Sequence, residues 1–305
     1  MKTKDLYFGT MKFVWLKLAL GAALTLGAII LFALFALIGS LFGQGGAAVG
    51  FILWLISSVA LYRFAMSYVG YLIKAGHVAV IAEAISSGAI PENQFEWGKN
   101  AVKSRFAMSN VYFVIDRLVS GAVRQLQNGV ENIASLFDAI PGISSVAAFV
   151  KLFIGVALGY IDECCLGYCF LQKDEGAFKS SCDGVVIYFQ NAKQLLKNAL
   201  KVSAVVMLTT LVALAIPAAL FLLLFKAIGW SPVAAIILAI FVAAFVRSAF
   251  IDSYIMIDMM KHYMDVVPET EISFDLYGKL CRLSGKFKKL FEKAKAETPE
   301  PVVEV

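Results

Sequence analysis

The residues best suited to chemistry lie in an apolar segment near the C-terminal end of the chain. Asp258 and His262 are four residues apart, so they share one face of a helix. Asp252 and Asp258 are six apart, so their carboxylates point in different directions and do not form an acid–base pair. Arg247 precedes them in the same segment. Ionisable residues inside an apolar segment are costly, and they often mark a substrate or ion pathway.

A second apolar segment carries Arg63 and Tyr68, and a third carries Asp116. The functional interpretation is a water-filled path or substrate pocket. A structural alternative is that Arg63 and Arg247 pair with carboxylates such as Asp116 or Asp252 and hold helices together, or that they reach lipid phosphates. The candidate binding or pore-lining residues are Arg63, Tyr68, Asp116, Arg247, Asp252, Tyr254 and Asp258.

The sequence contains none of the standard catalytic signatures. It has no Gly-x-Ser-x-Gly, no phosphate-binding glycine loop and no His-Glu-x-x-His. The motif Cys-Cys-x3-Cys lacks zinc-ligand spacing and has no histidine near it. We therefore expect no catalytic residues, no metal site and no cofactor, and we do not expect an enzyme. The abundant aromatic residues either form a cation–π cage for a quaternary ammonium group or pack and line membrane interfaces.

Basic residues are placed unevenly along this hydrophobic chain. Of the 305 residues, 60% are hydrophobic and 16% are charged. Twenty-one of the 27 Lys and Arg residues lie in residues 1–17, 74–105, 172–201 and 261–305. The short turns near 43–48, 127–142 and 227–232 contain none. Because cytoplasmic loops of membrane proteins are enriched in Lys and Arg, this pattern predicts an integral membrane protein with both termini in the cytoplasm.

The predicted fold is an all-α polytopic bundle of six transmembrane helices, arranged as three hairpins with cytoplasmic amphipathic helices. The predicted spans are about 18–42, 47–72, 106–123, 143–161, 202–226 and a segment that begins near Pro232. Span 106–123 is interrupted by Asp116 and Arg117, so it either crosses the membrane or lies along its surface. An even number of spans keeps both basic ends on one side.

The chain also repeats itself at an offset of 184, which relates Lys17 to Lys201 and Arg63 to Arg247. We predict one membrane domain over 1–295, built from repeat units of about 1–92, 93–184 and 185–290. Each unit contains an amphipathic helix followed by two spans. Residues 296–305 are acidic and contain proline, which predicts a disordered cytoplasmic tail.

The net charge of +5 bears on the expected partners. Because no nucleic-acid-binding motif accompanies the charge, we expect no nucleic acid. The expected partners are the lipid bilayer, with its anionic cytoplasmic leaflet, and a second copy of the chain in a homo-oligomer.

From about residue 95 to 290 the order of features resembles the C-terminal half of choline transporter-like proteins. The features are Cys164-Cys165 through Cys169, the segment from Val185 to Ala192, two spans, and a last span that closes on Asp258. The longer N-terminal half and the large extracellular loop of that family have no counterpart here. The resemblance implies a small cationic amine such as choline as the ligand.

These patterns together favour a small transporter or permease-like protein for a small solute, for which a cation is one candidate. The alternative is a membrane scaffold, an assembly factor or a membrane-shaping factor that does not transport. In that case the intramembrane charges pair with one another.

Overall fold

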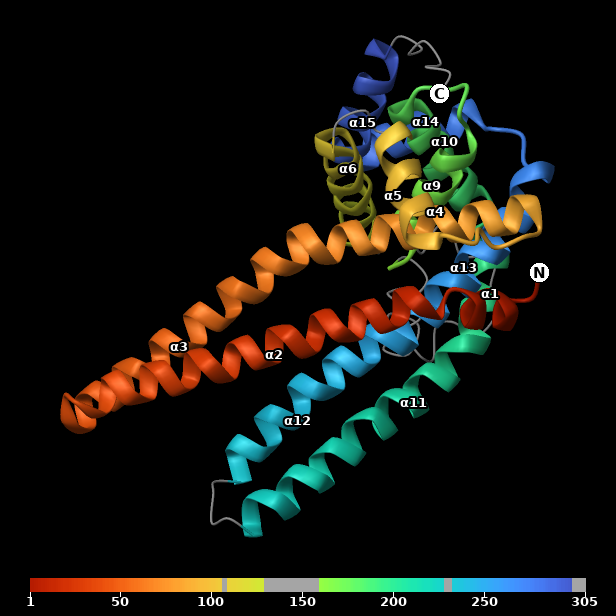
Figure 1. The fold of residues 1–305 in the computed structure, drawn as a ribbon. Helices are drawn as coiled ribbons and strands as arrows, with labels where there is room; N and C mark the ends of the chain where they lie inside the picture. The colour runs from red at the N-terminus through yellow and green to blue at the C-terminus, as the bar shows by residue number, and fades with distance from the viewer. Residues whose placement is uncertain (106–108, 129–158, 228–231, 298–305) are drawn as a thin grey trace, which may run out of the picture. The chain divides into compact units, whose positions relative to one another are not determined.

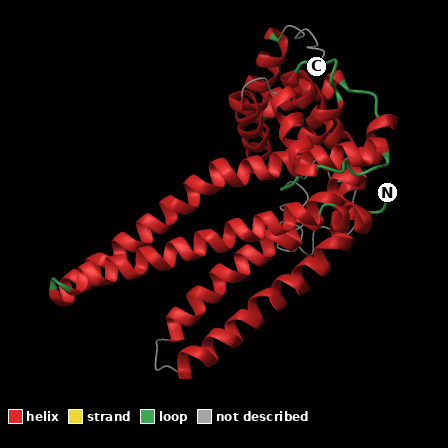
Figure 2. Ribbon diagram, viewed as in Figure 1, coloured by secondary structure: helices red, strands yellow, loops and turns green. Residues whose placement is uncertain are grey.

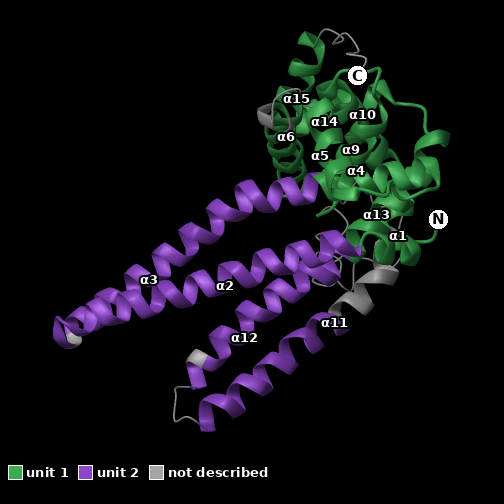
Figure 3. Cartoon of the chain, viewed as in Figure 1, with its two compact units in different colours: residues 1–10, 76–206, 254–305 green, residues 11–75, 207–253 purple. Residues whose placement is uncertain are grey.

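The structure is a computed structural model that describes residues 1–105, 109–128, 159–227 and 232–297 (Figure 1). Within these ranges every regular element is helical, as predicted, and Figure 2 shows no strand in them. The chain forms two compact units (Figure 3). Unit 1 contains Met1–Thr10, Gly76–Val206 and Tyr254–Val305, and unit 2 contains Met11–Ala75 and Met207–Ser253. Each unit therefore draws on distant parts of the sequence.

Four helices are long and apolar enough to cross a membrane, within the part of the chain that the structure describes. They are Met11–Ser40, Gly45–Ser87, Leu208–Ala227 and Ala235–Glu269, and they correspond to the first, second, fifth and sixth predicted spans. Membrane insertion is thus supported by the length and apolar composition of these helices. The predicted span at 143–161 lies almost entirely outside the described residues.

The predicted span at 106–123 corresponds in part to α6 (Ser109–Asn128). One face of this helix, formed by Ile115, Val119, Ala122 and Leu126, is buried inside unit 1. The three- and four-residue spacing of these side chains gives a single apolar stripe. Helix α6 carries Asp116, Arg117 and Arg124 on its other positions, and it is not among the four helices that are long and apolar enough to cross a membrane.

Unit 2 is built from two helical hairpins. The first consists of α2 (Met11–Ser40) and α3 (Gly43–Ala65), joined by a turn at Gly43, whose φ of +71° suits glycine. A Cβ on Gly39 would lie 2.6 Å from the Gly46 carbonyl oxygen, so the glycines permit close approach of the two backbones. The indole of Trp54 on α3 donates to the Ala28 carbonyl oxygen of α2 at 2.8 Å.

The second hairpin contains the unit-2 part of α11 (Ala192–Ala227) and α12 (Pro232–Val246). Pro232 is the first residue of α12, as predicted. The small side chains of Ala235, Ala239 and Ala243 recur every four residues, and all three are buried. Within unit 2, α12 packs on α2. No residue of 208–227 in α11 is buried, which suits a helix that faces lipid.

Each hairpin ends in a π-helical turn. In the first hairpin η1 (Met66–Gly70) joins α3 to α4 (Tyr71–Ser87). In the second, η3 (Arg247–Ile251) joins α12 to α13 (Asp252–Val266). A π-turn inserts one extra residue into a helix and is frequent at functional sites.

Unit 1 is a packed helical unit with its own core. Its further helices are α1 (Thr3–Gly9), α5 (Gln94–Arg105), α9 (Ile161–Leu171), α10 (Ala177–Gln190), the 3₁₀ turn η4 (Val267–Glu269), α14 (Phe274–Leu283) and α15 (Gly285–Ala296). Gly167 of α9 lies against Met260 and Met264 of α13. The rings of Tyr188 and Tyr263 stack in the core at 6.0 Å, and the Tyr263 hydroxyl donates to Gly184.

Helix α1 and Thr10, which follows it, are fixed by hydrogen bonds within unit 1. Thr10 Oγ1 donates to the Leu6 carbonyl oxygen, so at 2.9 Å it accepts from His77 Nε2. Gln94 Nε2 donates to the Gly9 carbonyl oxygen at 2.8 Å. His77 and Gln94 therefore hold the short N-terminal helix in place at a buried position.

Candidate functional site

Two of the seven candidate residues, Tyr254 and Asp258, lie one turn apart on α13 and meet α1. Thr3 Oγ1 of α1 donates to Asp258 Oδ1 at 2.8 Å. The ring of Tyr7, also on α1, meets the Tyr254 ring edge-on, with 5.4 Å between the ring centroids. We call Thr3, Tyr7, Tyr254, Asp258 and His262 the α1–α13 cluster.

The predicted shared face of Asp258 and His262 is confirmed. His262 Nδ1 donates to the Asp258 carbonyl oxygen at 2.8 Å and lies 3.4 Å from Asp258 Oδ2. Asp258 is only 7% exposed, and its Oδ2 accepts no hydrogen bond from any of the described residues. A largely buried carboxylate of this kind favours a positively charged neighbour.

The two tyrosine rings of the cluster can attract a cation. Tyr7 and Tyr254 are half-buried, and burial raises the pKa of Tyr7. A neutral tyrosine ring attracts cations through its face, and the attraction grows when water is partly excluded. A carboxylate beside two tyrosine rings has the elements of a site for a small organic cation.

Arg247 and Asp252 form an ion pair within unit 2, as the structural alternative predicted. The Arg247 Nε atom lies 3.5 Å from Asp252 Oδ1, and the two residues bracket the π-turn η3. Residues five apart lie on different faces of an α-helix, but the wider π-turn brings them to the same side. Lys17 Nζ on α2 donates to the neighbouring Ser253 hydroxyl at 2.8 Å.

The other candidates do not join either group. Arg63 and Tyr68 are exposed in unit 2, and the side chain of neither forms an ion pair or a hydrogen bond with a described residue. Asp116 is half-buried on α6 in unit 1. The seven residues are therefore divided between the units: Asp116, Tyr254 and Asp258 belong to unit 1, and Arg63, Tyr68, Arg247 and Asp252 belong to unit 2.

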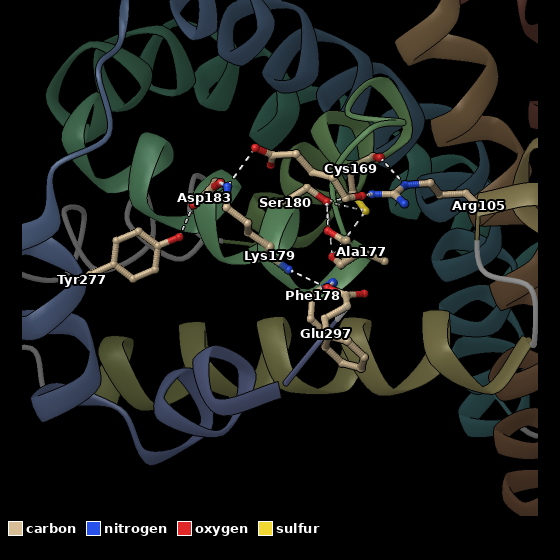
Figure 4. A network of polar contacts seen from close by, with 11 residues as sticks. Arg105, Cys169, Ala177, Phe178, Lys179, Ser180, Asp183, Tyr277 and Glu297 are labelled. Carbon is tan, nitrogen blue, oxygen red and sulfur yellow. Dashed lines mark hydrogen bonds and ion pairs between the residues drawn. The ribbon is translucent and has the colours of Figure 1, made fainter. Parts of the chain in front are cut away.

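The structure adds a polar network in unit 1 that the sequence analysis missed (Figure 4). Asp183 on α10 is 3% exposed and accepts hydrogen bonds from Lys179 Nζ and the Tyr277 hydroxyl. Burial lowers the pKa of Lys179, but hydrogen bonds to Asp183 and Glu175 raise it above its usual value on balance. Burial and the Asp183 carboxylate both raise the pKa of Tyr277.

Arg105 forms the other half of this network. Its guanidinium donates to the carbonyl oxygens of Cys169 and Glu175 and to Ser180 Oγ, at 2.7 to 2.9 Å. It thereby fastens the connection between α9 and α10 to the end of α5. These partners are far apart in the sequence, and no local motif indicates them. One local signal was available for Lys179 and Asp183, which are four apart on one helix face.

The cysteines are part of the core. Cys164, Cys165, Cys169 and Cys182 are buried free thiols, and burial raises the pKa of each. Such thiols remain protonated and unreactive at neutral pH. Over the described residues, no three His, Cys, Asp or Glu side chains are grouped as metal ligands.

Comparison of the chain with known protein families, with curated proteins and with solved structures gave no match.

Proposed function

We propose that the chain is an integral membrane protein whose α1–α13 cluster binds a small organic cation, and that it serves as a small transporter or permease-like protein. The observation that carries the proposal is the half-buried pair Tyr7 and Tyr254 beside the buried carboxylate of Asp258. The resemblance to choline transporter-like proteins, which itself includes Asp258, implies the same class of ligand.

A four-span arrangement fits the described helices. The chain would cross the membrane in α2, return in α3, cross again in α11 and return in α12. Each hairpin then begins and ends on one side, so all three segments of unit 1 lie on that side together with both termini. Because the four basic stretches fall largely in these segments, the positive-inside rule favours the cytoplasm. The six-span arrangement is the alternative to this proposal, and it depends on residues 143–158, which lie outside the described residues.

Transport also requires a path through the membrane. Buried positions are few in the apolar helices of unit 2, so further helices would be needed to enclose a path. A homo-oligomer would supply them. The Arg247–Asp252 pair lies at a π-turn, and π-turns are frequent at functional sites, which supports this proposal.

The first experiment measures uptake of choline and of tetramethylammonium into proteoliposomes that contain the purified protein. We expect saturable uptake by the wild type and at least a tenfold loss for Asp258→Asn, because the neutral amide no longer balances the cation. Asp265→Asn is the matched control, since Asp265 lies on the same helix and pairs with Lys261 on the surface. Tyr254→Phe should retain binding and Tyr254→Leu should lose it, since the ring face is the proposed contact.

The absence of both uptake and binding of these cations by the wild type would overturn the cation proposal. Equal uptake by Asp258→Asn and Asp265→Asn would show that the α1–α13 cluster is not the cation-binding site.

The second candidate is a membrane scaffold or assembly factor. The observation that favours it is that unit 1 has an extensive core of its own, tied by Arg105 and Asp183. In unit 2, the charge of Arg247 is already balanced by Asp252. Absence of uptake together with retention of the protein in a larger membrane complex would support this function.

A further inference from the structure

Glu297, the residue that follows α15, is hydrogen-bonded to the first turn of α10. Glu297 Oε2 accepts hydrogen bonds from the backbone N–H groups of Phe178 at 2.8 Å and Lys179 at 3.1 Å (Figure 4). Both segments belong to unit 1. The residues joined are 119 and 118 positions apart in the sequence.

This carboxylate takes the place of a missing helix cap. The first N–H groups of a helix have no partner within it, and a side chain at the N-cap position normally satisfies them. The N-cap of α10 is Gly176, which has no side chain to do so. Glu297 supplies the acceptor from elsewhere in the chain, and its negative charge also suits the positive end of the helix dipole.

Gly176 also leaves the space that the carboxylate occupies. A Cβ at this position would overlap the carboxylate of Glu297. The backbone angles of Gly176, φ −57° and ψ 146°, are open to any residue, so the glycine is not required by the turn itself. Its lack of a side chain matters for the contact with Glu297.

A second contact joins the same two segments. Lys293, one turn before Glu297, lies over the ring of Phe178 with its Nζ 5.3 Å from the ring centroid. The turn of α10 that receives Glu297 also carries Lys179 and Ser180, which bind Asp183 and Arg105. The end of α15 is thus attached to the same turn of α10 that supplies Lys179 and Ser180 to the polar network of unit 1.

We propose that Glu297 is a detachable latch that holds the C-terminal segment on α10. The latch has two states. In the closed state the carboxylate caps α10 and the last turn of α15 is held. In the open state the amides of Phe178 and Lys179 and the end of α15 become accessible together, while the rest of α15 remains anchored by Phe287 and Leu290, which are fully buried.

The test is hydrogen exchange followed by mass spectrometry on the full-length protein in detergent or nanodiscs. Loss of a helix cap corresponds to about a fivefold change in an opening equilibrium. We expect about fivefold faster exchange at Phe178 and Lys179 in Glu297→Ala, and a smaller change in Glu297→Gln, whose amide oxygen still accepts. Trypsin should also cleave after Lys293 and Lys295 faster in both variants.

Two further variants make the test specific. Gly176→Ala should open the latch although Glu297 is intact, because the new methyl group displaces the carboxylate. Glu292→Gln is the matched control on the same helix, since Glu292 is exposed and its Lys288 partner is 4.0 Å away. It should behave as the wild type.

Unchanged exchange and cleavage in both Glu297→Ala and Gly176→Ala would overturn the latch. So would faster exchange that extends to the core helix α9, because the contact would then support the whole unit and would not open locally.

Discussion

At the scale of single residues, burial decides which polar groups hold unit 1 together. Asp183 is buried with two donors, Lys179 and Tyr277, whereas most charged side chains of this unit remain in solvent. If a buried acceptor loses its donor, its desolvation is no longer offset by a hydrogen bond. Substitution of either donor should therefore lower the free energy of unfolding.

Replacing Tyr277 by Phe tests this network. The variant keeps the ring, which packs on Phe287 and Phe291, but removes the donor to Asp183. We expect a loss of about 1–3 kcal/mol in the free energy of unfolding, measured by denaturant titration in detergent micelles. Tyr68→Phe is the control, because Tyr68 is 66% exposed. Equal stability of the two variants would contradict the role of the Tyr277 hydroxyl.

The raised pKa of Tyr168 predicts that the stability of the folded protein depends on pH in the alkaline range. Burial, then Asp183 and Glu175, raise its pKa from 10.0 to about 12 in the folded protein. The unfolded chain therefore releases this proton first, so stability is fully present below pH 10 and falls as the pH rises towards 12. We expect Tyr168→Phe to shift the alkaline unfolding midpoint upward. Circular dichroism during an alkaline titration measures it, and a lower or equal midpoint would contradict the assignment.

At the scale of helices, the π-turn η3 explains how two charges coexist in an apolar helix. It places Arg247 and Asp252 within 3.5 Å although they are five residues apart. Each charge alone would be costly in the membrane, while the pair offsets much of that cost. The effects of substituting Arg247 and Asp252 on stability should therefore be coupled.

We expect each single variant, Arg247→Gln and Asp252→Asn, to destabilise the protein more than Arg247→Gln/Asp252→Asn does. The reason is that each single variant leaves one uncompensated charge. A double-mutant cycle on thermal stability in lipid nanodiscs measures the coupling, for which we expect 0.5–3 kcal/mol in order of magnitude. Arg63→Gln is the control, since Arg63 has no ion-pair partner among the described residues. Strict additivity would exclude the coupling.

The first turn of α15 is capped by Ser284, which also forms a hydrogen bond with Gln125 of α6. Ser284 Oγ accepts from the Phe287 N–H at 3.1 Å and donates to Gln125 Oε1 at 2.8 Å. Ser284→Ala should cost about 1 kcal/mol, and it should raise hydrogen exchange in the first turn of α15. Ser104→Ala, at an exposed hydroxyl of α5, should change neither quantity. An effect of the same size in both variants would contradict capping.

At the scale of the whole molecule, the number of spans decides where residue 135 lies. Four spans place it on the side of both termini, and six spans place it on the opposite side. A cysteine introduced at position 135 in a chain whose other cysteines are replaced can be labelled with a membrane-impermeant thiol reagent. We expect labelling from the side of the termini. Positions 174 and 45 are the controls for the two sides, and labelling of 135 together with 45 would establish the six-span arrangement.

The sequence by itself predicted the all-helical content and the four helices that are long and apolar enough to cross a membrane. Each is a property of local composition: a run of about 20 apolar residues needs lipid or protein around it wherever it lies. It also predicted the shared face of Asp258 and His262, because helical spacing fixes which residues are neighbours. The internal repeat remains a prediction.

Only the tertiary structure decided what the apolar stripe of α6 packs against and which distant residues meet. The contacts of Asp258 with Thr3, of Asp183 with Tyr277 and of Glu297 with the first turn of α10 join segments that are 255, 94 and 119 residues apart. Nothing in a local pattern selects such partners, since many side chains of the same type are available along the chain. Their choice follows from how the helices pack, because packing sets which polar groups are buried side by side and must satisfy one another.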